Sequence, residues 1–378
     1  DDERAEIVAD LKPALLVDDV FVEPAEWSPR ATSGPALVLY TSGSTGRPKG
    51  AILSHPALAF ALRSWAEPVM ALRPDDVVLA ALPLAHSYGL NGALLASLLA
   101  GATVRLVERF TADGVADILR REAITVFPGV ATMFRRLLDL PALRVAPSLR
   151  VALSGAAPCP WPIAEEWRAR TGVRILRGYG MTELFRPISY LAGDSTEIPE
   201  SIGRAVPGVE TRVVDDAGRP MPSGEVGELV IRTPAAMDGY LGAEDETRAV
   251  LRDGWFLTGD LATITADGFV RIAGRKRERI LRGGYSIFPG EVEATLLTHA
   301  AIAEAAVIGV PHDVLGEDVA AFVALKPGAQ AKPDEVIDYC RARLAAFKYP
   351  RRVTILAALP RSATGKILKA RLQDAADA

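Results

Sequence analysis

The sequence predicts an α/β fold: a large domain with mainly parallel sheets flanked by helices and a small barrel-like β region, followed by a small mobile α+β domain. Between about residues 36 and 210, short apolar runs alternate with segments of helical spacing, which is the order of βαβ units. After residue 200, strand-like runs are separated by Asp-Ala-Gly-Arg-Pro and Pro-Ser-Gly-Glu sequences, which favour antiparallel hairpins or a small barrel. Because parallel sheets gather ligands at the loops that follow their strands, we expect the functional site there.

The apolar runs give the expected elements in order. Strands are predicted at residues 36–40, 76–82, 102–107, 123–129, 149–155 and 173–180, with helices at 57–70 and 132–140. The last part predicts a helix at 291–299, strands at 304–310 and 318–325, a helix at 334–347 and a strand at 351–360. We therefore place a domain boundary near Gly274, giving domains 1–274 and 275–378, both of ordinary size.

Composition excludes several classes of function. A net charge of −4 gives no reason to expect nucleic acid or an anionic membrane as a partner. No apolar stretch approaches the roughly 20 residues of a membrane span. The acidic N-terminus is unlike a signal peptide, and Cys159 and Cys340 lie too far apart for a metal-type pair. These features predict a protein of the reducing cytoplasm.

A loop of small and hydroxyl residues follows the first predicted strand, in the sequence YTSGSTGRPKG (residues 40–50). It is not a Walker A loop, because Pro48 has no N–H to offer a phosphate and Gly50 replaces the hydroxyl that would bind Mg²⁺. Its backbone N–H groups, hydroxyls and single ammonium can still neutralise a polyphosphate. The residues concerned are Thr41, Ser42, Gly43, Ser44, Thr45, Gly46 and Lys49.

Four further motifs follow in order: GYGMTE (178–183), GWFLTGD (254–260), GRKRERILRGGYSIFPGEVE (274–293) and PRSATGKILK (360–369). Together with the loop, they resemble the adenylate-forming superfamily of acyl- and aryl-CoA synthetases. The resemblance implies that a carboxylate attacks the α-phosphate of Mg-ATP, giving an acyl-adenylate and pyrophosphate. A thiol such as coenzyme A then accepts the acyl group.

The resemblance also assigns roles to residues of the large domain. It places Tyr179, flanked by Gly178 and Gly180, against adenine, Thr182 at the α-phosphate and Glu183 on Mg²⁺, for which a carboxylate is a suitable hard ligand. Gly155, Ala156 and Ala157, in LSGAAP, would form one wall of the adenine and acyl site. His86 would lie between the ATP site and the acyl pocket and gate the entry of the carboxylate, although a lone histidine is more often structural. The other three histidines form no cluster that suggests a metal.

Further roles fall on the motifs that come later in the chain. By resemblance, Asp260 accepts hydrogen bonds from both ribose hydroxyls, Arg275 reaches the ribose or phosphates, and Lys366 contacts the substrate carboxylate and the α-phosphate. Arg277 takes the hinge position, where the family usually has Asp or Lys. Gly283 and Gly284 would let a pantetheine arm pass close to the backbone. The basic run around the hinge is either a solvated hairpin face or a surface that attracts the phosphates of coenzyme A; it comprises Arg271, Arg275, Lys276, Arg277, Arg279 and Arg282.

The acid itself is predicted only by class. The stretch AHSYGLN has no acidic residue to pair with an α-amino group, which disfavours an amino acid. The mostly apolar wall that the resemblance implies favours a fatty or aryl acid; it comprises Tyr88, Asn91, Gly129, Val130, Met133, Gly178, Met181 and Leu184. A dicarboxylate such as malonate or o-succinylbenzoate stays open, because Arg186 can pair with a second carboxylate if it points inward.

Two further expectations concern the molecule that accepts the acyl group and the extent of the large domain. Coenzyme A is the expected acceptor, with an acyl-carrier protein as the alternative. The phosphate loop comes early in the chain, so the large domain is expected to be N-terminally truncated relative to the family. A nucleotide-binding fragment without catalytic activity is therefore the competing hypothesis, while Lys49, Glu183, Asp260 and Lys366 favour an enzyme.

Overall fold

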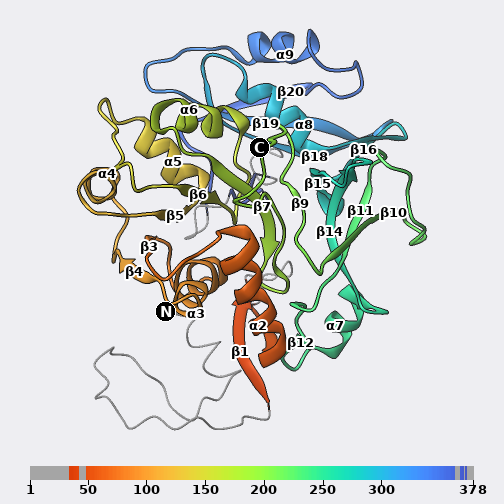
Figure 1. The fold of residues 1–378 in the computed structure, drawn as a ribbon. Coiled ribbons are helices and arrows are strands. Elements are labelled where there is room, and N and C mark those ends of the chain that lie inside the picture. Colours follow the sequence, from red (N-terminus) through yellow and green to blue (C-terminus); the bar gives the residue numbers. More distant parts are fainter. Residues whose placement is uncertain (1–33, 42–47, 362–366, 370, 373–378) are drawn as a thin grey trace. The chain divides into compact units, whose positions relative to one another are not determined.

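The structure is a computed structural model that describes residues 34–41, 48–361, 367–369 and 371–372. The chain forms two compact units, and Figure 1 labels their helices and strands. The first unit comprises Asp1–Thr211 and Ile231–Phe256, and the second comprises Arg212–Val230 and Leu257–Ala378. The domain boundary expected near Gly274 stays a prediction. The acidic N-terminus before residue 34 lies outside the described residues.

The first unit is built on a seven-stranded sheet with the order β4-β3-β5-β6-β7-β8-β9. The strands from β4 to β7 pair in parallel, whereas β8 pairs antiparallel with both β7 and β9. The predicted mainly parallel sheet is therefore confirmed. Its strands are β3 (Val77–Ala80), β4 (Thr103–Leu106), β5 (Val126–Gly129), β6 (Val151–Ser154), β7 (Ile175–Met181), β8 (Phe185–Ser189) and β9 (Arg204–Ala205).

Three helices pack together against this sheet and bury its main core (Figure 1). They are α4 (Ala112–Arg121), α5 (Ala131–Leu138) and α6 (Trp161–Thr171). Phe127 of β5, Phe134 of α5 and Trp167 of α6 are all fully buried. The Phe134 ring meets the Phe127 and Trp167 rings edge to face, with centroids 5.3 and 4.9 Å apart, a favoured aromatic geometry. This core fixes the strands whose carboxyl ends carry the candidate site.

The helix predicted at 57–70 is present but changes its winding. Helix α2 (His55–Ser64) begins at Ser54, whose hydroxyl accepts a hydrogen bond from the Ala57 N–H, as expected of an N-cap. The chain then continues as a π-helix, η1 (Trp65–Val69), around Pro68, which has no N–H for an α-helical bond. The remaining helices of this unit are the π-helix η2 (Tyr88–Leu95), α3 (Ala96–Leu99) and α7 (Glu244–Val250).

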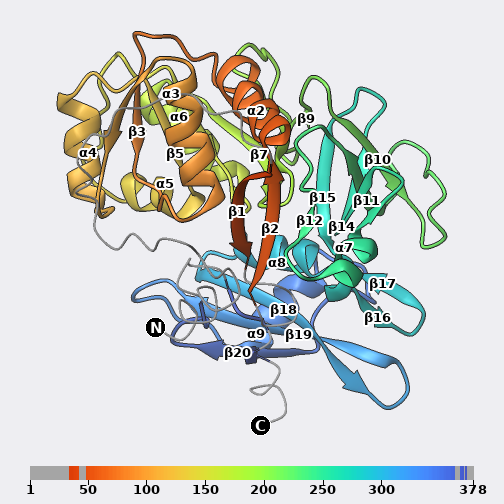
Figure 2. The ribbon, with the colours of Figure 1, turned by 90° about the horizontal axis from the view of Figure 1, so that it is seen from below.

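A small antiparallel sheet carries the two ends of the phosphate loop (Figure 2). It contains β1 (Pro35–Thr41), β2 (Lys49–Ser54) and β12 (Gly239–Tyr240), with β2 in the middle. Thr41 pairs with Lys49, and Tyr240 pairs with Ala51. Only the first of these strands was predicted from the sequence. The pairing holds the first and last residues of the loop side by side.

A five-stranded sheet follows in the region of predicted hairpins, and β14 pairs antiparallel with both β13 and β15. The expected turn after residue 214 is present, since the Asp215 N–H donates to the Arg219 carbonyl. The strands are β10 (Glu210–Val214), β11 (Gly227–Arg232), β13 (Leu251–Arg252), β14 (Trp255–Ile264) and β15 (Val270–Arg275).

The second unit ends in the predicted α+β domain, a sheet of order β17-β16-β19-β18 with β20 parallel to β19. Its strands are β16 (Ile280–Arg282), β17 (Tyr285–Ile287), β18 (Ile302–His312), β19 (Gly316–Leu325) and β20 (Arg352–Leu356), joined by the 3₁₀-helix η3 (Lys276–Glu278) and helices α8 (Pro289–Leu297) and α9 (Pro333–Arg341). Helix α9 is shorter than predicted, because residues after Arg341 form a tighter turn in which the Arg343 N–H bonds the Cys340 carbonyl, three residues before it.

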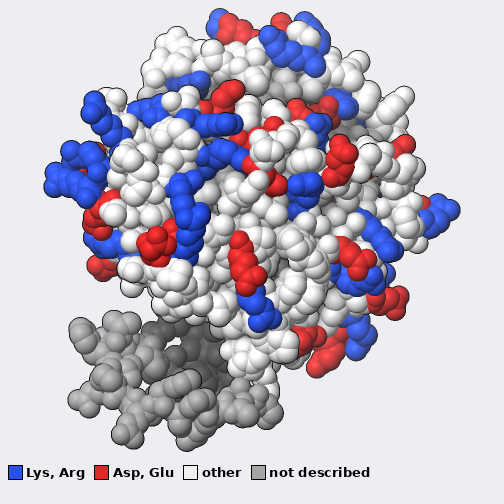
Figure 3. Space-filling view, in the orientation of Figure 1, with Lys and Arg blue, Asp and Glu red and all other residues white. Residues whose placement is uncertain are grey.

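Two general properties of the described residues bear on function. None of their helices is both long and apolar enough to cross a membrane. Acidic and basic side chains are interspersed on the face shown in Figure 3, as on an ordinary solvated surface.

Candidate active site

The predicted Thr182 and Glu183 lie in the turn between β7 and β8, at the carboxyl end of the parallel strands. Met181 pairs with Phe185 across this hairpin, and the register shifts between Tyr179 and Met181. A Cβ at Gly180 would lie 1.9 Å from the Phe185 carbonyl oxygen, so only glycine fits this backbone approach. The sequence therefore folds into a tight hairpin that holds both polar residues at the sheet edge where ligands are expected.

Glu183 is linked to the end of the phosphate loop through Tyr240. The Tyr240 hydroxyl donates a hydrogen bond of 2.8 Å to Glu183 Oε1, and the Lys49 ammonium lies 5.4 Å from the centre of the Tyr240 ring. Burial and the negative charge of Glu183 raise the pKa of Tyr240 well above its usual value. The phenol consequently stays a donor and fixes the orientation of the carboxylate. Lys49 also lies 3.8 Å from Glu246.

The sequence did not predict the contact between Tyr240 and Glu183, because Tyr240 belongs to no recognisable motif. It depends on the pairing of β12 with β2, which joins segments nearly 190 residues apart.

The predicted loop residues Ser42, Gly43, Ser44, Thr45 and Gly46 lie outside the described residues. Their anchors, Thr41 and Lys49, are described and paired.

The predicted adenine wall lies directly after β6. Gly155 is buried, whereas Ala156 and Ala157 are exposed. Ala156 has a φ of 62°, a left-handed conformation that costs a non-glycine residue energy and is enriched at functional sites. The chain therefore becomes exposed to solvent at Ala156 and Ala157, where the adenine ring is expected to approach.

The predicted gate residue, His86, lies just before the π-helix η2, in the segment that approaches Thr182. Ser87 Oγ lies 3.5 Å from Thr182 Oγ1, and the exposed His86 accepts the Tyr88 N–H at Nδ1, at 3.1 Å. The structure therefore brings His86 to the neighbourhood of Thr182, and its gating role stays a prediction. Tyr88 is buried, and its hydroxyl donates to the Leu153 carbonyl at 3.2 Å. Burial raises the pKa of Tyr88 to about 12.

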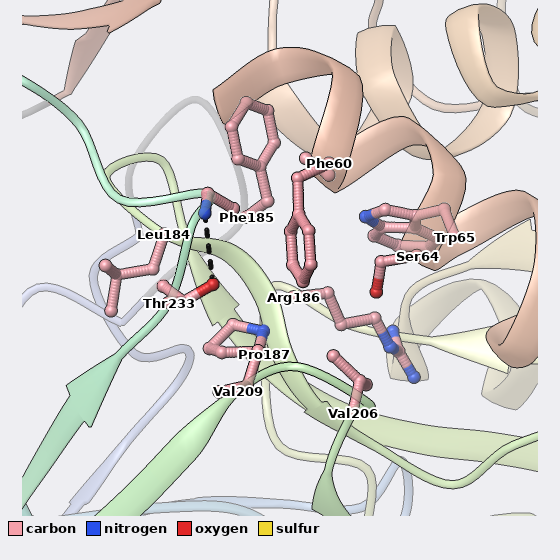
Figure 4. A pocket seen from close by; sticks show the side chains of 12 residues that line it. Phe60, Ser64, Trp65, Leu184, Phe185, Arg186, Pro187, Val206, Val209 and Thr233 are labelled. Atoms are coloured by element: carbon pink, nitrogen blue, oxygen red, sulfur yellow. Dashed lines mark hydrogen bonds between the residues drawn. The ribbon is translucent and has the colours of Figure 1, made fainter. Parts of the chain in front are cut away.

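Arg186, which the sequence left open, points inward and is 5% exposed. Its Nε donates to Ser189 Oγ at 2.9 Å, Nη1 to the Ser154 carbonyl at 3.1 Å and Nη2 to the Leu176 carbonyl at 2.9 Å. The side chain passes along the Trp65 ring, whose centre is 5.1 Å from the guanidinium carbon, as Figure 4 shows. The cavity drawn there has a volume of about 10 Å³, about the space of one water molecule.

A larger hollow of about 310 Å³ lies beside Tyr240. It is lined by residues of β2, β12 and α7 and by their neighbours, namely Ile52, Asp238, Gly239, Tyr240, Glu244, Thr247 and Arg248. Its lining therefore shares Tyr240 with the Glu183 contact.

The predicted ribose ligands come together within the second unit. Asp260 of β14 and Arg275 of β15 are register partners, and Arg275 Nε lies 3.4 Å from Asp260 Oδ1. Asp260 is buried, and its N–H donates to Thr258 Oγ1 at 3.1 Å. A carboxylate can accept several hydrogen bonds at once, which is the property that the predicted ribose role of Asp260 requires.

The hinge and the glycine pair occupy turns. Arg277 is exposed in η3, and the neighbouring Lys276 pairs with Glu228 at 2.9 Å and Asp216 at 3.0 Å. Gly283 and Gly284, with φ of 55° and 84°, form the turn between β16 and β17, for which glycine is well suited. These ion pairs show that part of the basic run is internally paired rather than only solvated.

Lys366 lies outside the described residues. Lys369, three residues later, contacts Glu278 and Glu293, both at 2.8 Å. Burial opposes the charge of Lys369, but the two carboxylates raise its pKa overall. The end of the PRSATGKILK motif is thereby tied to the hinge segment through Glu278.

Comparison with known proteins places these observations in a family. Residues 2–241 match the family described as AMP-binding enzyme, and residues 291–366 match the AMP-binding enzyme C-terminal domain. The chain belongs to the AMP-binding enzyme family. The predicted resemblance to adenylate-forming enzymes is thus confirmed, while the individual role of each site residue stays a prediction.

Three similar proteins show the range within this AMP-binding family. The feruloyl-CoA synthase of an Amycolatopsis species is 38% identical over 380 residues, covering 97% of this chain and 76% of the relative. ATP-bound MatB from Rhodopseudomonas palustris has a TM-score of 0.87 and 36% identity, covering 92% of this chain and 69% of that one. The o-succinylbenzoate coenzyme A synthetase MenE from Bacillus subtilis, in complex with ATP and magnesium ion, has a TM-score of 0.81 and 34% identity, covering 89% and 69%.

The residues present fit a magnesium-bound nucleotide of the kind that the family name implies. Glu183 Oε1 accepts a hydrogen bond from the Tyr240 hydroxyl, and among the described residues Oε2 accepts no hydrogen bond, so Oε2 is available to a hard cation. The same part of the chain contains no cluster of three His, Cys, Asp or Glu side chains suited to a metal. Glu183 would therefore hold Mg²⁺ together with phosphate oxygens rather than within a protein cage.

Proposed function

We propose that this member of the AMP-binding enzyme family is an AMP-forming acyl-CoA synthetase. It would join a carboxylic acid to the AMP part of ATP, with release of pyrophosphate, and then transfer the acyl group to the thiol of coenzyme A. The family match and the names of the similar feruloyl-CoA and o-succinylbenzoate-CoA synthetases support this proposal.

The observation that carries it is the cluster of Lys49, Tyr240 and Glu183. An ammonium at the end of a phosphate loop and a carboxylate suited to Mg²⁺ contact the same aromatic side chain. A reaction that breaks a bond between phosphates needs both, since charge must be neutralised on the leaving group and at the attacked phosphorus. Thr182, in the same turn as Glu183, can donate its hydroxyl to the α-phosphate.

In the first step, an oxygen of the substrate carboxylate attacks the α-phosphorus, and the bond to the β-phosphate oxygen breaks. We assign Lys366 to the electrostatic stabilisation of this step and the loop from Thr41 to Gly46, with Lys49, to the departing pyrophosphate. Mg²⁺ on Glu183 would supply further neutralisation of phosphate charge. These groups act by position and charge, without a covalent enzyme intermediate.

The residues of the second unit are assigned to the ribose and the thiol. Asp260 and Arg275 would bind the ribose hydroxyls and a phosphate, and their 3.4 Å contact supports a shared ligand. Gly283 and Gly284 would let the pantetheine arm approach the backbone. We further propose domains 1–274 and 275–378, with a hinge at Arg277 that alternates the two half-reactions.

The acyl pocket is assigned to residues near the ends of β5, β6 and β7 and to η2. The apolar members of this wall support a fatty or aryl acid. The inward Arg186 is the specific observation that favours the second candidate, a dicarboxylic acid. Coenzyme A is the proposed acceptor, with an acyl-carrier protein as the alternative, and the free Cys159 and Cys340 support a reducing cytoplasmic setting.

ATP–pyrophosphate exchange across a panel of fatty, aryl and dicarboxylic acids tests the proposal. We expect exchange that depends on at least one acid and on Mg²⁺, and loss of exchange in Glu183→Ala. Exchange with none of the acids by a folded chain that still binds ATP would support the competing hypothesis of a nucleotide-binding fragment.

A further inference from the structure

We propose that the acid bears a second carboxylate in its acyl part and that Arg186 is the residue that binds and selects it. This inference rests on the proposed acyl-CoA synthetase function and specifies its substrate class.

The first observation is that Arg186 carries a buried charge without a carboxylate partner. It forms no ion pair with any residue in the described part of the chain, and the one titratable group that acts on it is the neutral Tyr88 phenol, through its dipole and a side-chain hydrogen bond. Burial lowers the pKa of its guanidinium, so the folded protein pays a desolvation cost for this cation. Buried charges are normally paired. An arginine whose polar contacts are neutral is therefore suited to an anion that arrives with a ligand.

The second observation is where this charge lies. A Cβ at Gly155 would come 3.1 Å from Arg186 Nη1, and one at Gly178 would come 2.4 Å from Nη2. Gly155 directly follows β6 and Gly178 lies in the middle of β7, and both are assigned to the proposed acyl and adenine site. The guanidinium thus occupies the space beside these two glycines, and the Tyr88 ring borders Gly155, 3.0 Å from the Cβ that this glycine lacks.

The third observation concerns hydrogen-bond capacity. A guanidinium has five N–H donors, and the three bonds to Ser189, Ser154 and Leu176 use one donor on each nitrogen. One N–H on each terminal nitrogen is not used by these three bonds, and the Tyr88 hydroxyl also interacts with the guanidinium. Two terminal N–H groups in one plane match the two oxygens of a carboxylate. The three bonds to the protein hold the guanidinium in place, which reduces the entropy lost when the ligand binds.

A fourth observation indicates that the wall is not purely apolar. Asn91, on the same π-helix as Tyr88, is 1% exposed, and neither its Oδ1 nor its Nδ2 has a hydrogen-bond partner among the described residues. An unsatisfied buried amide is costly. A hydrocarbon acyl chain would leave both the amide and the arginine uncompensated, whereas an acid with a polar second group can compensate them.

The test compares acids that differ only in the second carboxylate, such as adipate with hexanoate and phthalate with benzoate. For the wild-type protein we expect acid-dependent ATP–pyrophosphate exchange with kcat/KM at least about tenfold higher for the dicarboxylate of at least one pair. Arg186→Met should lower kcat/KM for that dicarboxylate about 30-fold or more, mainly through KM, and change the monocarboxylate little. Arg186→Lys keeps the charge but loses the planar fork, so its kcat/KM for the dicarboxylate should lie between those of the wild type and Arg186→Met.

Two controls separate recognition from folding. Arg177→Met removes another buried arginine of β7, one that lies near Glu197, and should leave the ratio between the two acids unchanged. Asn91→Leu removes an unsatisfied amide, so it should raise the melting temperature while lowering kcat/KM for the dicarboxylate. Equal losses for both acids in Arg186→Met and Arg186→Lys would show a structural role and overturn the proposal.

Calorimetric titration of each acid into the wild-type protein and Arg186→Met gives a measurement that does not depend on catalysis. Dicarboxylate binding that requires Arg186, without exchange by any acid, would support this inference and overturn the proposed function. Exchange with monocarboxylates and no preference for a dicarboxylate in any pair would overturn this inference and leave the proposed function standing. Binding of neither acid would overturn both.

Discussion

Replacing Tyr240 with Phe removes one oxygen from the contact that carries the proposed function. The Tyr240 hydroxyl donates to Glu183 Oε1 at 2.8 Å and belongs to a half-buried side chain. Tyr240→Phe keeps the ring over Lys49 but leaves Glu183 without this donor. The carboxylate that we assign to Mg²⁺ then loses its fixed orientation.

The expected magnitude follows from the kind of bond. A hydrogen bond to a charged group contributes about 1.5 to 3 kcal/mol, and partial solvent access places this one near 1.5 kcal/mol. That value corresponds to about a tenfold loss in kcat/KM for Mg-ATP, because 1.4 kcal/mol is a factor of ten. The loss should appear mainly as a higher Mg²⁺ concentration for half-maximal rate.

The assay is ATP–pyrophosphate exchange at a saturating acid concentration and varied Mg²⁺. Tyr190→Phe is the matched control, because the Tyr190 hydroxyl is also hydrogen-bonded, to the backbone of Ile198, but lies outside the site. Its Mg²⁺ dependence should equal that of the wild type. An unchanged Mg²⁺ dependence in a folded Tyr240→Phe protein would refute the role that we give to this contact.

Three further predictions test other parts of the account. Lys366→Ala should nearly abolish exchange but spare thiolysis of supplied acyl-adenylate, and unchanged exchange would remove Lys366 from the first step. Gly180→Ala should destabilise the protein by about 2 kcal/mol or more in urea unfolding, because its Cβ would lie 1.9 Å from the Phe185 carbonyl oxygen; wild-type stability would contradict the tight hairpin. Lys369→Met should lower the free energy of unfolding by about 1 to 2 kcal/mol, because it removes the ion pairs with Glu278 and Glu293. Burial alone would raise the pKa of Glu278, but Lys369 lowers it below the ordinary 4.5, so this part of the stability is present above about pH 4.5 and is lost as the pH falls through the lower folded pKa. Stability of the variant should fall less than that of wild type between pH 5 and 3, and identical pH curves would contradict the pairing.

The parallel strands could be predicted because local sequence is sufficient for them. Short apolar runs such as residues 123–129 and 149–155 correspond to β5 and β6, whose residues are all buried. The family resemblance likewise located Thr182 and Glu183, which lie in the turn after β7, and Asp260, which lies within β14. These residues belong to motifs that are contiguous in the sequence, so they can be recognised without knowledge of the fold.

What escaped prediction depends on contacts between distant segments. Strand β2 follows directly after the Gly-rich loop, and its partner β12 contains only two residues, too few for a pattern. The contact between Glu183 and Tyr240 exists only because these strands pair. Arg186 belongs to a strand whose five residues are all buried, so alternation could not tell whether its side chain points inward.

The most direct test of the central claim is the identity of the products. The protein is incubated with Mg-ATP, coenzyme A and the acid that supports exchange, and the nucleotides and thioesters are quantified by chromatography and mass spectrometry. We predict AMP, pyrophosphate and an acyl-CoA in equal amounts, with an acyl-adenylate when coenzyme A is omitted. ADP and phosphate as products, or a thioester without AMP, would contradict the account.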